Sequence, residues 1–384
     1  MSRAVKIAFL TPEYPHPETP GLCGGIGTSI MNLASALNVL GAKVSILVYG
    51  QQSDGFFHEN GIDFYRIKNN QSRKWPRYKT QKKIEKLINQ LVKADKIDLV
   101  EAADWTGITS FIKPKCPVIV KVHGSDTYFS YFSRQPLEWK KRFAEKRAMR
   151  KANALIAVSQ FSADVTKSVM RLKKDFTIIP NGIDTGKFHP KVAETSNTIL
   201  YFGTLVRKKG SLELPLIFNK VFEKNASAKL VLVGLDSNDP ITGNRSVWQM
   251  MQPLFTPEAL ENVTYAGSVA YEEIKNHIDQ AAICVFPSFA EALPVSWMEA
   301  MAMGKAIVAS DIGWAKEMIV DASEGFLVHP TKHEAFADRI VALLEDPELR
   351  RLFGQQARKK VEAKFSFEVV AKQNLDFYKR VLKR

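Results

Sequence analysis

The sequence predicts an α/β protein of two doubly wound, Rossmann-like domains with parallel sheets. The chain has 384 residues, more than a single hydrophobic core usually organises. The order strand, glycine-containing loop, helix, strand begins near residue 6 and begins again near residue 198. Residues 180–197 carry turn residues, two prolines and no apolar period, which is typical of an interdomain linker. We therefore expect domains at 1–190 and 191–365, with a helix at 366–384 that crosses back to the first domain.

Apolar runs, and the proline and glycine residues that end them, predict the elements of the first domain. A Pro-rich loop follows the first strand, and a helix with apolar residues at helical spacing then runs from about residue 26 until Gly41 ends it. Consecutive strands joined by such a crossover form a parallel sheet. The predicted strands are 6–11, 43–48, 99–102, 118–122, 154–158 and 177–179.

Polar residues follow two of these strands at the point where each strand ends. Glu101, Asp104 and Trp105 come with the third strand, and His123 and Asp126 follow the fourth. In open parallel sheets, ligands bind beyond the carboxyl ends of the strands. We therefore expect these side chains to face a cleft and, apart from His123, to contact an acceptor.

Gly24 and Gly25 stand at the start of the first helix, where a glycine pair lets the backbone approach a phosphate closely. The alternative is a flexible loop and a plain helix cap. A dinucleotide-binding fingerprint fits poorly, because Ile30 occupies the place of the third glycine and no acid ends the second strand.

The second domain repeats the architecture without repeating the sequence. A basic loop at 203–210 is bounded by glycines and follows the first strand of this half. The predicted strands are 198–202, 229–233, 263–265, 283–286, 306–309 and 326–328, and the predicted helices are 211–223, 334–344, 347–364 and 367–382.

The stretch 287–310 contains two carboxylates that flank a predicted helix start. Glu291 lies in the loop after a buried strand, Pro294 suits the first helical position, and Gly304 ends the helix. Glu299 then lies roughly 7 Å along the helix axis. The amides of residues 292–295 point out of the helix start, where the dipole favours anions. Two carboxylates with an anion site between them suit a nucleotide sugar.

The amino-acid composition limits the cellular compartments in which the protein is expected. The chain is 45% hydrophobic and 24% charged, as in an ordinary globular protein. Its three cysteines lack metal-ligand spacing and are expected to be reduced thiols. The N-terminus begins a strand at once, without a signal peptide, and no apolar run is long enough to span a bilayer. We expect a cytoplasmic protein, peripheral at the inner face of the membrane.

The net charge of +14 is concentrated in the first half. Residues 73–86 and 139–151 each hold seven basic residues and one acid, Glu85 and Glu145 respectively. Two interpretations stay open: solvated helix faces, or a surface for anionic membrane or a phosphorylated lipid-linked acceptor. Neither segment belongs to a nucleic-acid-binding motif, so no nucleic-acid partner is expected.

At this point the chain resembles a known family. The spacing of Glu291 and Glu299 looks like the E-x7-E signature of the retaining nucleotide-sugar glycosyltransferases of family 4. Further segments agree in the family's order along nearly the whole chain: the Gly24–Gly25 loop, HGSD at 123–126, PNGID at 180–184, FGTLVRKKG at 202–210, VLVG at 231–234, YAGSV at 265–269 and EGFLV at 324–328. The resemblance implies the GT-B architecture, with the donor on the C-terminal domain and the acceptor on the N-terminal one.

The resemblance also implies roles for single residues. Glu299 is expected on the ribose hydroxyls, and Glu291 on the donor sugar. Lys209 is expected on the diphosphate, which Gly25 approaches from the other domain, and His123 lies near the transferred sugar. The backbone near Val269 holds the base. The amides that assist Glu291 belong to the stretch Ala292, Leu293, Pro294 and Val295. Glu291, His123 and Lys209 are thus the expected catalytic residues.

Two positions depart from the family pattern. Thr204 stands where the family usually has an arginine that acts with the later lysine on the leaving phosphate. Arg207 or Lys208 in the same loop would restore that cation, and we favour Arg207. Ala292 stands where the family often has glycine, which narrows the backbone conformations but leaves its amide available.

The implied reaction is hexose transfer with retention, from UDP-glucose or a related UDP-hexose to a saccharide or lipid-linked saccharide in exopolysaccharide or cell-envelope glycan synthesis. No D-x-D sequence is present, so we expect neither a metal nor another cofactor. Two alternatives remain: a non-hydrolysing epimerase or phosphorylase on the same fold, or a non-catalytic membrane-surface binding protein.

Overall fold

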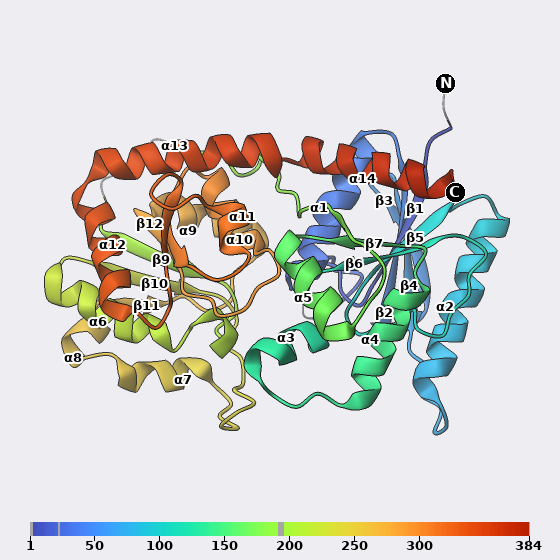
Figure 1. The fold of residues 1–384 in the computed structure, drawn as a ribbon, viewed down its shortest axis with the longest axis horizontal. Coiled ribbons are helices and arrows are strands. Elements are labelled where there is room, and N and C mark those ends of the chain that lie inside the picture. The colour runs from blue at the N-terminus through green and yellow to red at the C-terminus, as the bar shows by residue number, and fades with distance from the viewer. Residues whose placement is uncertain (1–2, 22–23, 191–195, 384) are drawn as a thin grey trace. The chain divides into compact units, whose positions relative to one another are not determined.

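The computed structural model describes residues 3–21, 24–190 and 196–383. The chain forms two compact units, which are Met1–Gly182 with Phe367–Arg384, and Ile183–Ser366. Figure 1 shows helices covering a sheet in each unit. The first boundary falls inside the segment 180–197 that the sequence predicts as a linker. The predicted α/β class, with a largely parallel sheet in each unit, is confirmed.

Unit 1 contains an eight-stranded sheet in the order β3-β4-β2-β1-β5-β6-β7-β8. All neighbours pair in parallel except β3 and β4. Its strands are β1 (Lys6–Thr11), β2 (Lys43–Gln51), β3 (Gly55–Glu59), β4 (Ile62–Lys68), β5 (Leu99–Ala103), β6 (Val118–Val122), β7 (Ala154–Ala157) and β8 (Thr177–Ile178). Its helices are α1 (Gly25–Val39), α2 (Pro76–Lys93), α3 (Asp126–Ser133), α4 (Trp139–Lys151), α5 (Gln160–Met170) and α14 (Phe367–Leu382).

The hairpin of β3 and β4 is an element that the sequence prediction did not include. Its signal is the dipeptide Asn60–Gly61, in which both residues have positive φ, 50° and 78°. Asn-Gly is the preferred pair for a two-residue turn of this kind. The flanking strand β3 is mostly exposed and lacks a regular alternation of apolar and polar residues. The spacing of apolar residues therefore did not predict a strand here.

Helices pack on both faces of the unit 1 sheet. One core joins β1 and β2 to α1 and α14, through residues such as Phe9, Leu33 and Phe377. The opposite core joins the sheet to α2 and to the loop after β5, through residues such as Leu10, Ile88 and Ile108. The helix α14 therefore completes unit 1, although all of unit 2 precedes it in the chain.

Unit 2 contains a six-stranded, all-parallel sheet in the order β11-β10-β9-β12-β13-β14. Near-continuous apolar strands are typical of sheets buried on both faces. Its strands are β9 (Thr198–Phe202), β10 (Lys229–Val233), β11 (Val263–Tyr265), β12 (Ile283–Phe286), β13 (Ala306–Ser310) and β14 (Gly325–Val328). Its helices are α6 (Glu213–Lys224), α7 (Val247–Met251), α8 (Pro257–Leu260), α9 (Ile274–Gln280), α10 (Val295–Ala302), α11 (Ala315–Met318), α12 (His333–Glu345) and α13 (Pro347–Lys364), with 3-10 turns at Arg207–Lys209, Gln252–Leu254 and Tyr271–Glu273.

The longest helices of the described residues, α2 and α13, have 18 residues each. Both carry charged side chains on their exposed faces and bury only one stripe. None of the helices in the described part of the chain is long and apolar enough to cross a bilayer.

A buried hydrogen bond ties α14 to the sheet, and we expect its loss to destabilise unit 1. The hydroxyl of Tyr378 donates to Glu101 at 2.6 Å, and the Glu101 residue is only 3% exposed. Tyr378→Phe removes the donor and leaves a buried carboxylate with one partner fewer. The free energy of unfolding should fall by about 1–3 kcal/mol. Urea denaturation measures this change, with the exposed Tyr131→Phe as a control; equal effects of the two substitutions would contradict the prediction.

Candidate functional site

The loop after β12 and the start of α10 form the centre of the candidate site in unit 2. Glu291 is half-buried in that loop. Pro294 is the N-cap, with φ −71° and ψ 125°, and the helix begins at Val295, one residue later than predicted. Gly304 follows the C-cap Met303 with φ 66°, as expected for a helix stop. The side chain of the N-cap residue Pro294 makes no capping hydrogen bond.

A close approach of two loops brings Lys209 to Glu291. A Cβ on Gly210 would lie 1.9 Å from the carbonyl oxygen of Pro287, and φ at Gly210 is 72°. The backbone N–H groups of Phe289 and Ala290 both donate to the carbonyl of Lys208, at 2.8 and 3.1 Å. Only glycine permits this contact at residue 210. The loop 203–210 is thereby fixed against the loop that carries Glu291.

The resulting pair joins Lys209 Nζ to Glu291 Oε1 at 3.5 Å, with both side chains largely buried. Burial alone would lower the pKa of Lys209, but the neighbouring carboxylate of Glu291, with Tyr201 and Glu299, raises it. Lys209 therefore stays protonated at neutral pH. Two residues that the sequence analysis assigned to one donor site therefore lie together in the structure, as a fixed cation beside a carboxylate.

Glu299 lies on the buried face of α10, one turn beyond its first residue, and is 5% exposed. Burial raises the pKa of its carboxyl to about 7, against the opposing effects of a hydrogen bond from Tyr271 and the charges of Lys209 and Lys187. Lys187 Nζ lies 4.5 Å from the centre of the Tyr271 ring. Glu291, Lys209 and Glu299 thus act on one another electrostatically.

The loops that follow β9, β10 and β11 are tied together at the carboxyl edge of the sheet. Gly203 N–H donates to Val233 at 2.9 Å, and Gly234 N–H donates to Gly267 at 2.8 Å. A Cβ on Gly234 would lie 2.1 Å from the carbonyl oxygen of Gly203. Val269 follows in the third of these loops and is half-buried. The predicted donor residues of unit 2 therefore come from adjacent loops at one edge of the sheet.

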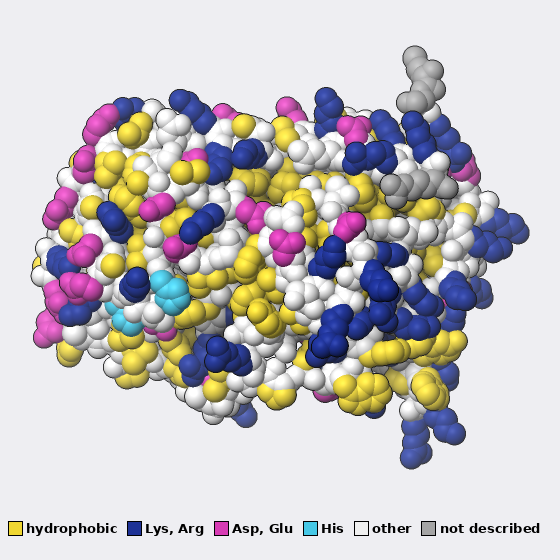
Figure 2. Space-filling model, viewed as in Figure 1, with side chains coloured by type: hydrophobic (Ala, Val, Ile, Leu, Met, Phe, Trp, Pro, Cys, Tyr) yellow, Lys and Arg dark blue, Asp and Glu magenta, His cyan; other side chains and the backbone are white. Residues whose placement is uncertain are grey.

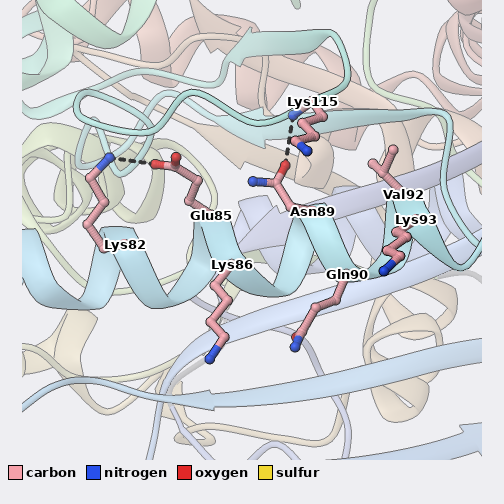
Figure 3. A pocket seen from close by; sticks show the side chains of 8 residues that line it. All are labelled: Lys82, Glu85, Lys86, Asn89, Gln90, Val92, Lys93 and Lys115. Atoms are coloured by element: carbon pink, nitrogen blue, oxygen red, sulfur yellow. Dashed lines mark hydrogen bonds and ion pairs between the residues drawn. The ribbon is translucent and has the colours of Figure 1, made fainter.

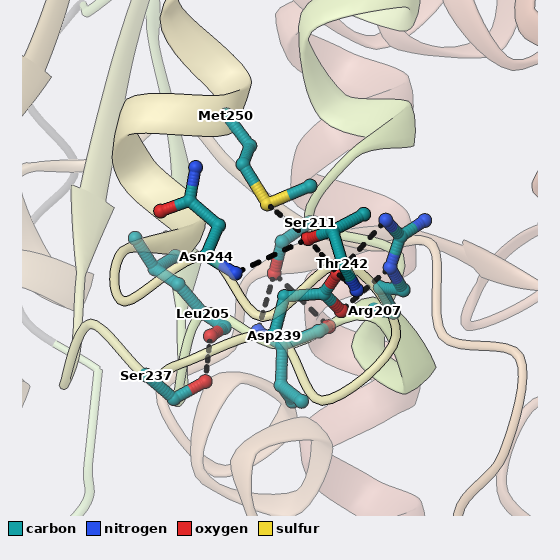
Figure 4. Close-up of polar contacts among 9 residues, drawn as sticks. Leu205, Arg207, Ser211, Ser237, Asp239, Thr242, Asn244 and Met250 are labelled. Atoms are coloured by element: carbon teal, nitrogen blue, oxygen red, sulfur yellow. Dashed lines mark hydrogen bonds and ion pairs between the residues drawn. The ribbon is translucent and has the colours of Figure 1, made fainter.

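Arg207, the residue favoured to replace the family arginine, is held by a carboxylate. Its Nε and Nη2 donate to Asp239 at 2.6 and 3.0 Å, and Thr242 donates to the same carboxylate through N–H and hydroxyl (Figure 4). These hydrogen bonds, led by Arg207, hold the pKa of Asp239 well below its usual range. Thr204 presents its carbonyl oxygen to the hydroxyl of Tyr201 at 3.1 Å. The described ion pair therefore fixes the loop after β10 to the loop after β9.

In unit 1, His123 and Asp104 come together. The backbone N–H of His123 donates to Asp104 Oδ1 at 3.0 Å. Burial, with the charge of Lys121 nearby, lowers the pKa of His123 to about 3, so its ring is neutral at physiological pH. Burial also raises the pKa of Asp104 to about 7, mainly against the hydrogen bond from His123.

The other predicted acceptor residues have partners within unit 1. Glu101 is buried and accepts the hydrogen bond from Tyr378, so the structure places it in the core beneath α14. Burial raises its pKa against the charge of Lys121. Trp105 Nε1 donates to Asp126 Oδ1 at 3.0 Å, which orders the loop after β5 beside the start of α3. Of this group, Trp105 and Asp126 are partly exposed.

Glu13 holds the start of α1. Gly24 is the N-cap of this helix and Gly25 its first residue. The N–H of Gly27 donates to Glu13 Oε1 at 2.8 Å, and a Cβ on Gly24 would lie 3.4 Å from the same oxygen. A carboxylate from the Pro-rich loop thus already uses part of the anion-attracting helix start.

The described residues contain no group of three or more His, Cys, Asp or Glu side chains able to hold a metal ion. Of the three cysteines, Cys116 and Cys284 are free thiols, while Cys23 lies outside the described residues. Burial raises the pKa of each of these two thiols to about 12. Neither is therefore a reactive thiolate at neutral pH.

Sequence reasoning missed several residues of this site. Lys187 and Tyr271 act on Glu299, Tyr201 acts on Lys209, and Asp239 holds Arg207. Only Lys187 had a signal, its position in the Gly- and Asp-containing segment 180–197, which was interpreted as a linker. Tyr201 directly precedes the segment 202–210 that contains Lys209. Asp239 and Tyr271 lie far in sequence from Arg207 and Glu299, and the order of the strands brings them together.

Comparisons with known proteins match each half of the chain to a glycosyltransferase family model. A family model described as "Glycosyl transferases group 1" matches residues 183–360, and one described as "Glycosyltransferase Family 4" matches residues 23–187. An alpha-maltose-1-phosphate synthase of Mycolicibacterium smegmatis is 24% identical over 98% of this chain and 100% of its own. The capsular polysaccharide biosynthesis glycosyltransferase CapM of Staphylococcus aureus is 26% identical over 62% of this chain and 64% of its own.

Solved structures share the fold. A sucrose-phosphate synthase from Thermosynechococcus elongatus superposes with a TM-score of 0.79 at 19% identity, covering 98% of this chain and 99% of that one. Anabaena Alr3699/HepE in complex with UDP-glucose superposes with a TM-score of 0.71 at 18% identity, again covering 98% and 99%. At these identities the likeness establishes the fold.

The raised pKa of Glu299 predicts a pH-dependent stability that Glu299→Gln removes. Because its pKa is about 7 in the folded protein and 4.5 ordinarily, the native state holds this proton more tightly than the unfolded chain does. Stability from this group is present at low pH and lost as the pH rises. Between about pH 4.5 and about pH 8, the wild type should lose roughly 3 kcal/mol relative to the variant.

Urea denaturation across this pH range measures the difference between the two proteins. The exposed Glu261→Gln is the control. A difference between wild type and Glu299→Gln that stays constant with pH would show that the pKa of Glu299 is the same in the folded and the unfolded protein, which contradicts the prediction.

Proposed function

Because the chain belongs to glycosyltransferase family 4 and has the GT-B fold, we propose that it is a retaining hexosyltransferase. Its donor is UDP-glucose, and its acceptor is a saccharide or a lipid-linked saccharide. The observation that carries the proposal is the buried pair of Lys209 and Glu291 at 3.5 Å, beside the buried Glu299.

Each member of this cluster has a chemical task. Lys209 keeps its proton and sits in a low-dielectric site, so it is suited to stabilise the negative charge of a departing diphosphate. Glu291 is suited to accept hydrogen bonds from sugar hydroxyls, with assistance from the stretch Ala292–Val295. Glu299 is suited to the ribose hydroxyls, and the backbone near Val269 to the base. In this role Lys209 and the start of α10 replace a metal ion, and no cofactor is required.

In the proposed reaction the acceptor hydroxyl oxygen bonds to the anomeric carbon as the bond from that carbon to the diphosphate breaks. The electron pair leaves with the UDP, and the hydroxyl proton passes to a departing phosphate oxygen. Attack on the face that the diphosphate leaves retains the anomeric configuration without a covalent enzyme intermediate. Glu291 then positions the sugar and is no nucleophile.

His123 is suited to the transferred sugar as a neutral ring. With its pKa lowered to about 3, it offers one donor and one acceptor nitrogen and brings no charge to the sugar. Its backbone is held by Asp104, which limits the orientations of the ring. Gly24 and Gly25 remain the proposed contacts of unit 1 to the diphosphate.

The donor and the cellular setting rest on similarity and charge. The Anabaena protein of the same fold binds UDP-glucose, and the Staphylococcus relative acts in capsular polysaccharide synthesis. We accordingly propose exopolysaccharide or cell-envelope glycan synthesis in the cytoplasm, at the inner face of the membrane.

Removing either member of the buried pair should abolish most donor turnover. Lys209→Ala removes the cation on the leaving group and should lower kcat for UDP release from UDP-glucose about 10²–10³-fold. Glu291→Gln keeps the shape but weakens the hold on the sugar hydroxyls, with an expected loss of about 10²-fold. Release is measured without acceptor and with EDTA present. The exposed Lys229→Ala is the control, and unchanged turnover in both site variants would reject the proposal.

Arg207 and Asp239 can be tested against each other, since both belong to one ion pair. If Arg207 also contacts the diphosphate, Arg207→Ala should lower kcat by about tenfold or more beyond the effect of Asp239→Asn. Asp239→Asn keeps the guanidinium and weakens only its anchor. Steady-state kinetics of UDP release compare the two variants. Equal losses would assign Arg207 to holding the loop after β10 alone.

A further inference from the structure

The exposed surface of α2, α4 and the loop between β5 and β6 combines aromatic rings with cations. Figure 2 shows Lys and Arg side chains crowded over this part of unit 1, with hydrophobic side chains among them. Trp75 is 75% exposed and Trp139 is 71% exposed. We define the basic-aromatic face by these aromatic residues: Trp75, Tyr78, Phe111, Trp139 and Phe143.

Three rings of this face, Tyr78, Phe111 and Phe143, form a connected row. Tyr78 of α2 meets Phe111 edge to face at 6.1 Å, and Phe111 lies 6.4 Å from Phe143 of α4. On α4, Trp139 and Phe143 are four residues apart and therefore lie along one side of the helix. The row thus runs across both helices, with Phe111 between them.

Both helices are fixed to the intervening loop. Gln81 of α2 donates to the hydroxyl of Ser110 at 3.0 Å, and Arg147 of α4 donates to the carbonyl of Ser110 at 3.0 Å. The guanidinium of Arg147 also covers the Phe111 ring at 4.7 Å. These contacts hold the loop and both helices together, so the basic-aromatic face has a fixed structure.

Cations from both helices crowd around the row. Partial desolvation lowers the pKa of Lys151, and positive neighbours on α2, α4 and the loop add to the effect; these are Arg147, Lys113 and Lys82. A pocket of about 600 Å³ continues the surface along α2, and four lysines line it: Lys82, Lys86, Lys93 and Lys115 (Figure 3). None of the predicted donor residues lines this pocket.

The two acids within the basic segments neutralise little of the positive charge of the face. Glu145 is fully buried and accepts from the N–H groups of Asp126 and Thr127 at the start of α3, at 3.1 Å each. Glu85 is paired with Lys82 at 2.7 Å. Outside the two segments, Asp54 pairs with Lys83 and Asp126 with Lys141. The other basic residues of the segments still give the face an excess of positive charge.

We propose that the basic-aromatic face docks unit 1 on an anionic lipid bilayer, an inference that rests on the proposed lipid-linked class of acceptor. Cations attract anionic headgroups, and Trp and Tyr gain most at the interface between headgroup and hydrocarbon. A nucleic acid fits less well, since Arg147 and Lys82 already cover the Phe111 and Tyr78 rings, so these faces are poorly available to stack bases. The docking holds the enzyme where a lipid-linked saccharide would be presented.

Flotation with phosphatidylcholine vesicles, with and without phosphatidylglycerol, tests the docking. The full chain should bind only the anionic vesicles. The double variant Lys79→Glu, Lys140→Glu should lower the partition coefficient by roughly 30-fold or more, because each basic residue near the surface contributes about fivefold. Lys372→Glu, Lys379→Glu makes the same charge change on α14, on the other face of the sheet, and should change binding by less than about twofold.

A variant without the two exposed tryptophans separates the insertion of aromatic side chains into the bilayer from electrostatic attraction to it. Trp75→Ala, Trp139→Ala should keep the salt-sensitive binding and lose the binding that remains at high salt. Equal losses in the α2–α4 and α14 charge variants would overturn the proposal, as would tighter binding to single-stranded RNA through the same residues.

UDP release in vesicle-free solution should be unchanged in all these variants. A wild type that binds anionic vesicles but releases no UDP would reject the proposed function and leave the docking surface intact.

Discussion

The candidate site of unit 2 depends on one steric contact, the approach of Gly210 to the carbonyl of Pro287. No side chain fits between them, since a Cβ would lie 1.9 Å from the oxygen. The contact fixes a loop from β9 against the loop after β12, and the hydrogen bonds to Lys208 hold it there. Because Lys209 stands between Lys208 and Gly210, the same contact sets the position of its charge. A cation placed before the ligand arrives costs no reorganisation during the reaction, which is the main advantage of an enzyme's electrostatics over those of water.

The site is then tuned by burial as much as by charge. Lys209 keeps its proton because carboxylates outweigh desolvation, whereas for Glu299 desolvation outweighs the nearby cations. In unit 1, burial makes His123 neutral. A buried carboxyl with a pKa of about 7 is costly to leave without partners, and ligand hydroxyls are suitable partners. Binding of a nucleoside to Glu299 would therefore favour its ionised form and release a proton near neutral pH.

The sequence was informative where a local period or a motif was enough. Most strands of both sheets and the helices α1, α12 and α13 followed from apolar runs and helix stops, and motif resemblance assigned Lys209 and Glu291 to one donor site without predicting their ion pair. The hairpin of β3 and β4 was missed because its outer strand is exposed, although Asn60–Gly61 marked the turn. Asp239 and Tyr271 were not predictable, since nothing near them in sequence indicates Arg207 or Glu299. Glu101 was expected at a ligand and lies instead beneath Tyr378, because strand-end position alone does not tell which face of the sheet a side chain takes.

The place of α14 has a consequence for how the protein is made. This helix covers α1 and the buried Glu101 in unit 1, yet it follows all of unit 2 in the chain. During synthesis, unit 2 leaves the ribosome complete and can fold while the first 182 residues still lack their closing helix. Until α14 arrives, the apolar face that it covers is open to solvent or to other chains. The order of translation therefore makes unit 1, although it is begun first, the last part of the molecule to be finished.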